Sequence, residues 1–186
     1  MKADKTTTIT TSAITAAIAA ILASSALIIP VMAQPAYTQL VQASAARTQG
    51  SLFLSVTAAS AIPRFPDNFI QSVLVFGYAW VDTTTGHGIV AAIHPSFRDS
   101  NQNPAAWHTH TVILTSGTSS SNFCIQQLGT SQAGLSIINN KLSVNIATMQ
   151  SGSISPNVAA SFVVQPDSGC AATGLGVKVL STAGIS

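Results

Sequence analysis

The chain has 186 residues, of which 47% are hydrophobic and 6% are charged, and its formal net charge is +2 at pH 7. Typical soluble proteins carry about 25% charged residues, and this chain contains no glutamate. The few basic residues form no stripe with interleaved aromatics, so nucleic acid is not an expected partner. The composition provides for one packed domain and argues against long, exposed helices.

The first 33 residues are typical of an export signal. Lys2 and Lys5 precede an apolar run over residues 13–33, and Val31 and Ala33 have the positions expected before a cleavage site. The same run is nearly long enough to cross a bilayer as an uncleaved anchor, which would be the chain's membrane contact. Both interpretations export the remainder, so we expect an extracellular or cell-surface protein. Its composition suggests an archaeal secreted protein.

Residues 34–50 are small and polar, and we expect a linker or a short helix there. From residue 51 onward, short apolar runs alternate with turn residues, as in strands. The strongest run, 69–82, is apolar on both faces, which predicts a central strand packed on two sides and bent at Gly77. The expected strands are 51–59, 69–82, 88–94, 107–115, 123–128, 135–138, 141–149, 158–166 and 170–181.

This spacing predicts an all-β domain over residues 51–186, arranged as a single antiparallel β-sandwich of about nine strands. Asn139 and Asn140 are expected to form a hairpin turn, because asparagine tolerates the positive φ that such a turn needs. Cys124 and Cys170 are the two cysteines of the chain. In an exported protein an even count favours a disulfide between them over a thiolate metal ligand or a reactive thiol.

The stretch from His94 to His110 holds three of the four histidines. His108 and His110 are two residues apart on an expected strand, so both side chains point to one face. His94 ends the preceding strand, and a hairpin-like return would bring it beside His108. Three imidazoles suit copper or zinc, and Asp99 in the intervening loop is a candidate fourth ligand. His87 lies at the opposite end of its strand and is not expected at this centre.

Three interpretations of these histidines stay open. They form a metal site, they are structural or surface residues, or they carry out acid–base catalysis. The sequence contains nothing that resembles a nucleophile elbow, which would have supported the catalytic interpretation. The corresponding functions are an exported binding protein that holds copper or zinc, a cell-surface structural or interaction protein that self-associates or contacts other proteins, and an extracellular enzyme. The enzyme is the least favoured of the three.

Overall fold

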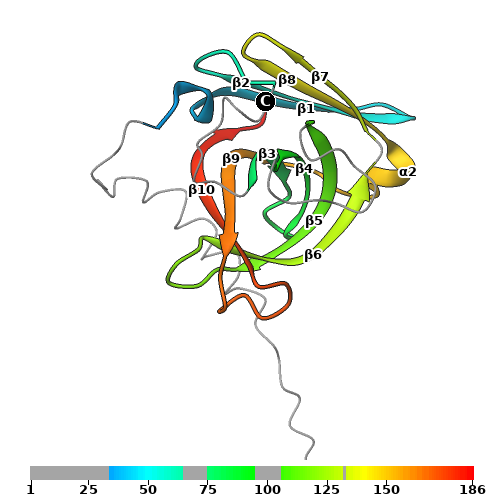
Figure 1. Ribbon diagram of the computed structural model, residues 1–186. Helices are drawn as coiled ribbons and strands as arrows, with labels where there is room; N and C mark the ends of the chain where they lie inside the picture. The colour runs from blue at the N-terminus through cyan, green and yellow to red at the C-terminus, as the bar shows by residue number, and fades with distance from the viewer. Residues whose placement is uncertain (1–33, 65–74, 95–105, 132) are drawn as a thin grey trace, which may run out of the picture.

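A computed structural model of the chain describes residues 34–64, 75–94, 106–131 and 133–186, and these form ten strands in two sheets (Figure 1). The expected export signal, residues 1–33, lies outside the described residues. Within them, no helix is long and apolar enough to span a bilayer. The strands are β1 (Leu40–Arg47), β2 (Ser51–Ala58), β3 (Val75–Val81), β4 (His87–Ile93), β5 (His108–Ser116), β6 (Phe123–Ser131), β7 (Gly134–Ile138), β8 (Lys141–Ala147), β9 (Val158–Pro166) and β10 (Leu175–Gly184).

Six of the strands close into an antiparallel barrel in the order β10-β6-β5-β4-β3-β9, and the other four form a separate sheet in the order β1-β2-β8-β7. The all-β prediction is confirmed, but the single sandwich is wrong. Figure 1 shows the barrel nearly end-on, with the four-stranded sheet lying across β3 and β4. Alternating apolar residues fit a barrel wall and a sandwich layer equally well, so the sequence pattern could not separate them.

The N-terminal part also differs from expectation. Residues 34–50 contain a short 3-10 helix, Ala36–Thr38, followed by strand β1, which pairs antiparallel with β2. Only one residue of β1, Ala43, is deeply buried, so the strand has too little apolar periodicity to be recognised in the sequence. Its structure comes from the ladder with β2, which is a tertiary contact.

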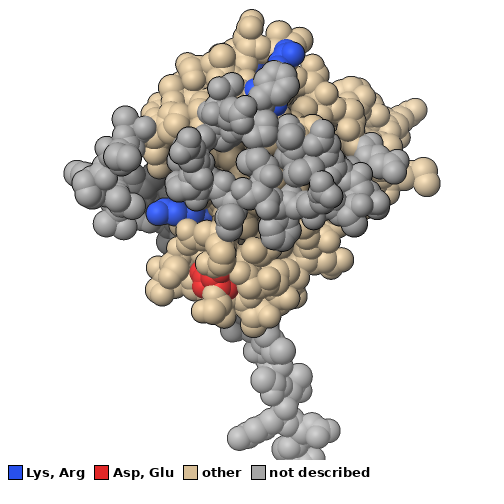
Figure 2. All heavy atoms as spheres, viewed as in Figure 1, with Lys and Arg blue, Asp and Glu red and all other residues tan. Residues whose placement is uncertain are grey.

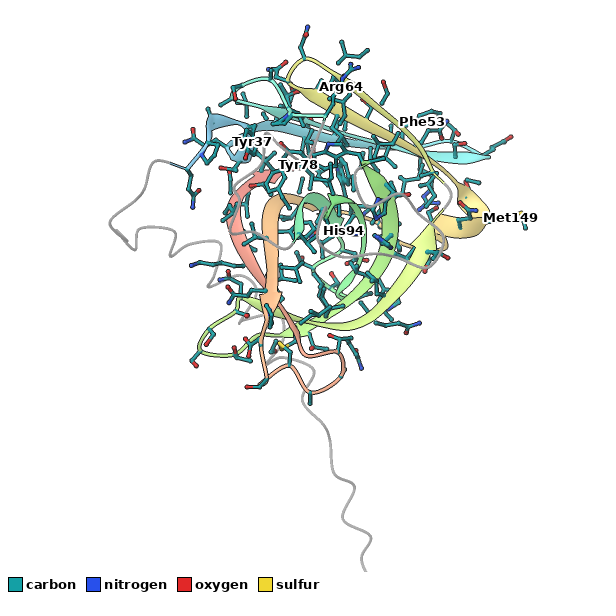
Figure 3. The ribbon with its side chains drawn as sticks, in the orientation of Figure 1. Tyr37, Phe53, Arg64, Tyr78, His94 and Met149 are labelled. Carbon is teal, nitrogen blue, oxygen red and sulfur yellow. A yellow bond between two sulfur atoms is a disulfide. The ribbon has the colours of Figure 1, made fainter. Side chains whose placement is uncertain are left out.

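Two hydrophobic cores result from the two sheets. The larger lies between the four-stranded sheet and the outer face of the barrel, and it contains Tyr78 and Trp80 of β3, both fully buried. Figure 3 shows Tyr78 at this junction and His94 within the barrel. The smaller core lies inside the barrel and contains Val90, Val112 and Phe162 among others. Strand β3 is therefore packed on both faces, as its sequence predicts.

Gly77 allows β3 to pass close to β9 inside the barrel. A Cβ atom at this position would lie 2.8 Å from the ring of Phe162 and 2.5 Å from the carbonyl oxygen of Ala91. No side chain fits there without displacing the wall. Elsewhere, Asn139 has φ of 53° in the β7–β8 hairpin, which confirms the turn expected from the sequence.

The barrel has one weakly paired seam. Strand β10 forms nine register pairs with β9 but only two with β6, at Gly176↔Cys124 and Val177↔Phe123. The disulfide between Cys124 and Cys170 lies at this seam, which confirms the predicted pairing. It joins β6 to the β9–β10 loop, and thus covalently fastens the place where the ladder is shortest.

A carboxylate strengthens the same region. Asp167, in the β9–β10 loop, accepts hydrogen bonds from the hydroxyls of Ser121 and Thr118, each at 2.6 Å, and from the backbone N–H of Gly169. The two hydroxyls and this N–H lower the pKa of Asp167, because all three stabilise its charged form. The network ties the β5–β6 loop to the β9–β10 loop.

Charged side chains are sparse on the molecule. In the face shown in Figure 2, those of the described residues are isolated from one another rather than gathered into a surface of one sign. This follows from a composition that is 6% charged.

Removing the disulfide should destabilise the fold. Replacing Cys124 and Cys170 with serine releases a loop of 46 residues in sequence separation, and the chain-entropy model gives a loss of up to about 4 kcal/mol. The free energy of unfolding from urea titrations measures this change. Reduced wild-type protein is the control and should match the double variant. Equal stability of the oxidised and reduced wild type would contradict a fastening role.

Asp167 should contribute stability that acid removes. Because folding lowers its pKa, the contribution is complete above the ordinary aspartate pKa of about 3.9 and disappears as the pH falls through the lower, folded value. The urea midpoint of Asp167→Asn should therefore lie below that of the wild type near neutrality and converge with it in strong acid. Ser121→Ala, which removes one of the two hydroxyl donors to Asp167, should show the same convergence, and a constant difference at every pH would exclude this linkage.

Candidate metal centre

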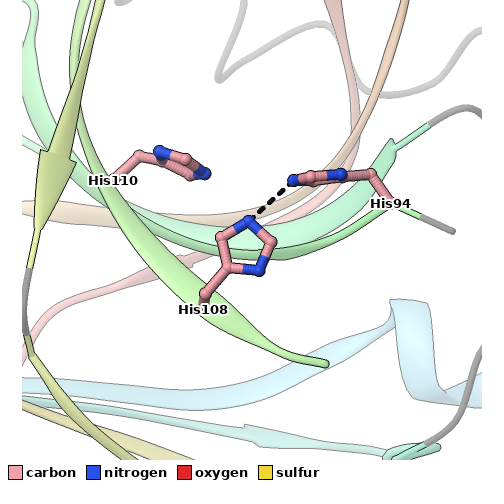
Figure 4. A group of neighbouring side chains, drawn as sticks. All are labelled: His94, His108 and His110. Carbon is pink, nitrogen blue, oxygen red and sulfur yellow. Dashed lines mark hydrogen bonds between the residues drawn. The ribbon is translucent and has the colours of Figure 1, made fainter. Parts of the chain in front are cut away.

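His94, His108 and His110 meet inside the barrel. Strand β4 pairs antiparallel with β5, and Ala92 stands opposite His108 while Val90 stands opposite His110. His94 follows β4 directly, so the return of the chain places it beside the first residues of β5. This is the juxtaposition that the sequence predicts. Figure 4 shows the three imidazole rings converging from β5 and from the end of β4.

Alternation along β5 explains why both of its histidines point inward. His108 and His110 share the inner face of the strand with Val112 and Leu114, whereas Trp107 packs against the outer core. The Trp107 ring stacks on Tyr78 at a centroid distance of 5.8 Å, and its Nε1–H donates to the carbonyl of Pro63. These contacts fix the start of β5, and residue 108 then faces the interior.

The three side chains are deeply buried, with exposed fractions of 3% for His94, 8% for His108 and 4% for His110. One nitrogen from each ring lies within 4.8 Å of the others, so the group could hold a metal ion. Burying three imidazoles in an apolar barrel is costly unless their nitrogens are satisfied by hydrogen bonds or by a metal. Among the described residues, no other set of three histidine, cysteine, aspartate or glutamate side chains has this geometry.

Backbone carbonyls orient two of the rings. The Nδ1–H of His108 donates to the carbonyl of Ala106 at 2.8 Å, and the Nδ1–H of His110 donates to that of Gly129 at 3.3 Å. Each bond fixes the proton on Nδ1 and leaves Nε2 as the nitrogen with a lone pair. Metal-binding histidines are commonly held in this way. No residue pattern could have identified these carbonyls, because both belong to the backbone.

The third ring shares a hydrogen bond with the second. The Nε2 atoms of His94 and His108 lie 2.6 Å apart. With the proton of His108 on Nδ1, its Nε2 accepts and the Nε2–H of His94 donates. A metal ion bound by both atoms would replace this proton, as metal binding generally displaces protons from its ligands.

Two other residues considered from the sequence do not join this group. His87 is exposed at the far end of β4, opposite Ile113 of β5, as expected. Asp99, the candidate fourth ligand, lies outside the described residues and remains a prediction. Both cysteines are in the disulfide, so no thiolate is available and a copper–thiolate site is excluded by the donor chemistry.

An apolar cavity of about 70 Å³ adjoins the centre. His94 and His110 form part of its wall, and the remaining wall is apolar, including Val90, Val112 and Phe162.

Tyr78 lies on the outer side of the barrel wall and is also completely buried. Its hydroxyl donates to the carbonyl of Tyr37 at 2.6 Å, and desolvation together with the charge of Tyr37 raises its pKa. Tyr78 is therefore a neutral structural residue.

The orientation of the rings gives a direct spectroscopic expectation. In the metal-free protein, long-range ¹H–¹⁵N spectra should show His108 and His110 as Nδ1–H tautomers, because backbone carbonyls accept from Nδ1. Exposed His87 is the control and should show the mixture that is usual for free imidazole, in which Nε2–H predominates. An Nε2–H tautomer at His108 would contradict the hydrogen bond to Ala106.

Comparison with known proteins identified no relative whose function could be transferred to this centre. No protein-family model, no curated protein and no solved structure matches this chain. What the three histidines do is therefore inferred from their burial, their mutual distances and the orientation of their nitrogens.

Proposed function

We propose that this protein is an exported metal-binding protein that holds copper or zinc through His94, His108 and His110. The observation that carries the proposal is the convergence of three buried imidazoles, two of which are oriented by backbone carbonyls so that Nε2 faces the centre. A structural role needs hydrogen bonds only, and does not require three rings to aim one nitrogen each at a common point.

The distances suit a metal after small adjustments. Nitrogen atoms bound tetrahedrally at about 2.0–2.1 Å from one ion lie about 3.3 Å from each other. The Nε2 atoms of His94 and His108 are closer than this, at 2.6 Å, and the three ligand atoms are all within 4.8 Å. Rotations of the side chains would separate the close pair and draw the third nitrogen inward. The rigid strand that carries two of the rings keeps the change small.

The donor set selects the metal. Neutral imidazoles without thiolates suit copper(II) and zinc, and copper(II) has the highest affinity among the first-row divalent ions. Magnesium and calcium prefer oxygen ligands and are disfavoured. A fourth ligand would come from Asp99, from water or from another small molecule. Binding, storage or delivery of the metal agrees best with this centre, and catalysis is not part of the proposal.

Export is supported by the disulfide and by the N-terminal run over residues 13–33. Disulfides persist mainly in oxidising compartments, and this one fastens the barrel. Cell fractionation tests the assignment. Recovery of the chain from the medium or the cell surface with its cysteines oxidised is expected, and a cytosolic chain with reduced cysteines would contradict export.

Metal titration tests the binding function. Isothermal titration of the purified protein with copper(II) or zinc should give one ion per chain. His108→Ala should lower the affinity by more than about 100-fold, since even outer-shell changes at metal sites cost about 10–100-fold. His110→Ala should do the same. The affinity should also fall with acidification, because the ligands bind as neutral imidazoles.

His87→Ala is the matched control, because it removes an exposed histidine from the same pair of strands. It should leave the affinity unchanged. Electron paramagnetic resonance of the copper(II) form adds a readout independent of affinity, namely nitrogen couplings that are reduced in His108→Ala. Wild-type binding no tighter than micromolar, or equal loss in His87→Ala, would overturn the proposal.

A further inference from the structure

A second pocket lies on the outside of the barrel, and none of the three buried histidines lines it. Strands β5 and β6 form one side of this outer pocket, and the other side is the short helix α2 (Thr148–Ser151) with the loop that follows it. Figure 1 shows α2 next to β6, and Figure 3 shows Met149 of α2 projecting outward. The volume is about 300 Å³, at the lower end of the range for small-molecule sites.

Gly129 of β6 explains why this space is open. It stands opposite Thr111 of β5 in the ladder, and a Cβ atom on residue 129 would lie 2.3 Å from the Thr111 hydroxyl oxygen. A side chain here would therefore displace Thr111 and narrow the outer pocket. A glycine within a strand commonly marks a place where another group approaches the backbone closely.

The floor of the outer pocket is apolar and has a polar group on each flank. The strand register places Ile113 of β5 between His87 of β4 and Gln127 of β6, and all three residues line the pocket. Residues paired across neighbouring strands point to the same face of the sheet. An imidazole and a carboxamide, which both offer hydrogen-bond donors and acceptors, thus border a half-buried apolar side chain.

The opposite wall is held in position without a ligand. The Arg47 guanidinium of β1 donates to the carbonyl of Ile154 at 2.6 Å, and the Ile154 side chain is buried in the larger core. The backbone N–H of Gly152 donates to the carbonyl of Thr148 at 3.0 Å. Because this wall is already formed, binding a ligand requires little further ordering of the chain.

The chemistry of the lining defines the class of ligand. Gln150, Ser151 and Ser153 add an amide and two hydroxyls to the wall, and none of the described lining residues is a lysine, arginine, aspartate or glutamate. A charged ligand would lose hydration without gaining an opposite charge from this lining. A purely apolar ligand would leave the amides and hydroxyls without partners. A ring with an apolar face and hydroxyls around its edge satisfies both the floor and the flanks, and a pyranose sugar has this form.

We propose that the outer pocket binds one neutral pyranose, either as a free monosaccharide or as the end of a surface glycan. At about 30 Å³ for each heavy atom, the volume of about 300 Å³ accommodates about ten heavy atoms, which is the size of one such ring with its hydroxyls. This inference does not rest on the metal-binding function, because the two sites share no residue.

Amide ¹H–¹⁵N spectra of the metal-free protein test the site. Titration with glucose, galactose, mannose and N-acetylglucosamine should give saturable shifts at Gly129 and Gly152 for at least one sugar at millimolar concentrations. Glucuronate, which adds a carboxylate to the same kind of ring, should bind more weakly. Oligosaccharides that end in the bound sugar distinguish the two sources, because a glycan-end site keeps its affinity for them and a free-sugar site loses it.

Gln127→Ala removes one polar flank and should lower the sugar affinity by about three- to tenfold, as expected for one hydrogen bond. Gln126→Ala is the matched control, because Gln126 is the preceding residue of β6, is exposed and does not line the outer pocket. It should leave the affinity unchanged. His87→Ala should also weaken sugar binding while it leaves metal binding intact, so the two sites are separated in one variant.

Three results would each overturn the sugar proposal. The first is the absence of saturable shifts at Gly129 and Gly152 with all of the neutral sugars. The second is tighter binding of glucuronate than of the neutral sugars. The third is a sugar affinity that is the same in wild type, Gln127→Ala and His87→Ala. None of these results bears on the metal-binding function, which the copper and zinc titrations test separately.

Discussion

The antiparallel ladder between β4 and β5 is the contact on which the histidine centre depends. It sets Ala92 opposite His108, and so brings the end of one strand to the start of the next. A shift of this register by one residue would turn the inner face of β5 outward. His108 and His110 would then face the outer core, and the barrel interior would receive Thr109 and Thr111 instead. The aromatic contacts of Trp107 oppose such a shift.

The barrel around this ladder is stabilised unevenly. Strands β3, β4 and β9 are packed between the barrel interior and the four-stranded sheet, which buries Tyr78 and Trp80 completely. On the opposite side, β6 and β10 share two register pairs, and the disulfide with the Asp167 network fastens them. His94 directly follows β4 of the well-packed wall, whereas His108 and His110 belong to β5, which lies between β4 and β6. The cavity wall includes residues of both sides of the barrel, among them Val90 of β4 and Val177 of β10.

The polar groups buried inside the barrel lower the stability of the fold, and this loss of stability indicates a binding role. Three buried imidazoles and an unfilled apolar space both lower the stability of a core. Leucine or valine at these positions, with larger neighbours, would give a better-packed barrel. The protein instead keeps the rings, orients them through the carbonyls of Ala106 and Gly129, and leaves space beside them. Stability that is given up in this way is typical of binding sites.

The all-β class, the disulfide, the two-sided burial of β3 and the convergence of His94 with His108 and His110 could be predicted from the sequence, because each follows from alternation, cysteine count or a short chain return. Three features became visible only in the folded protein: six strands close into a barrel, residues 40–47 form β1, and a cavity adjoins the histidines. Alternation of apolar residues indicates which side of a strand is buried but not which element covers it. Several strands together determine whether a barrel closes, whether a weak strand pairs and whether a space stays unfilled.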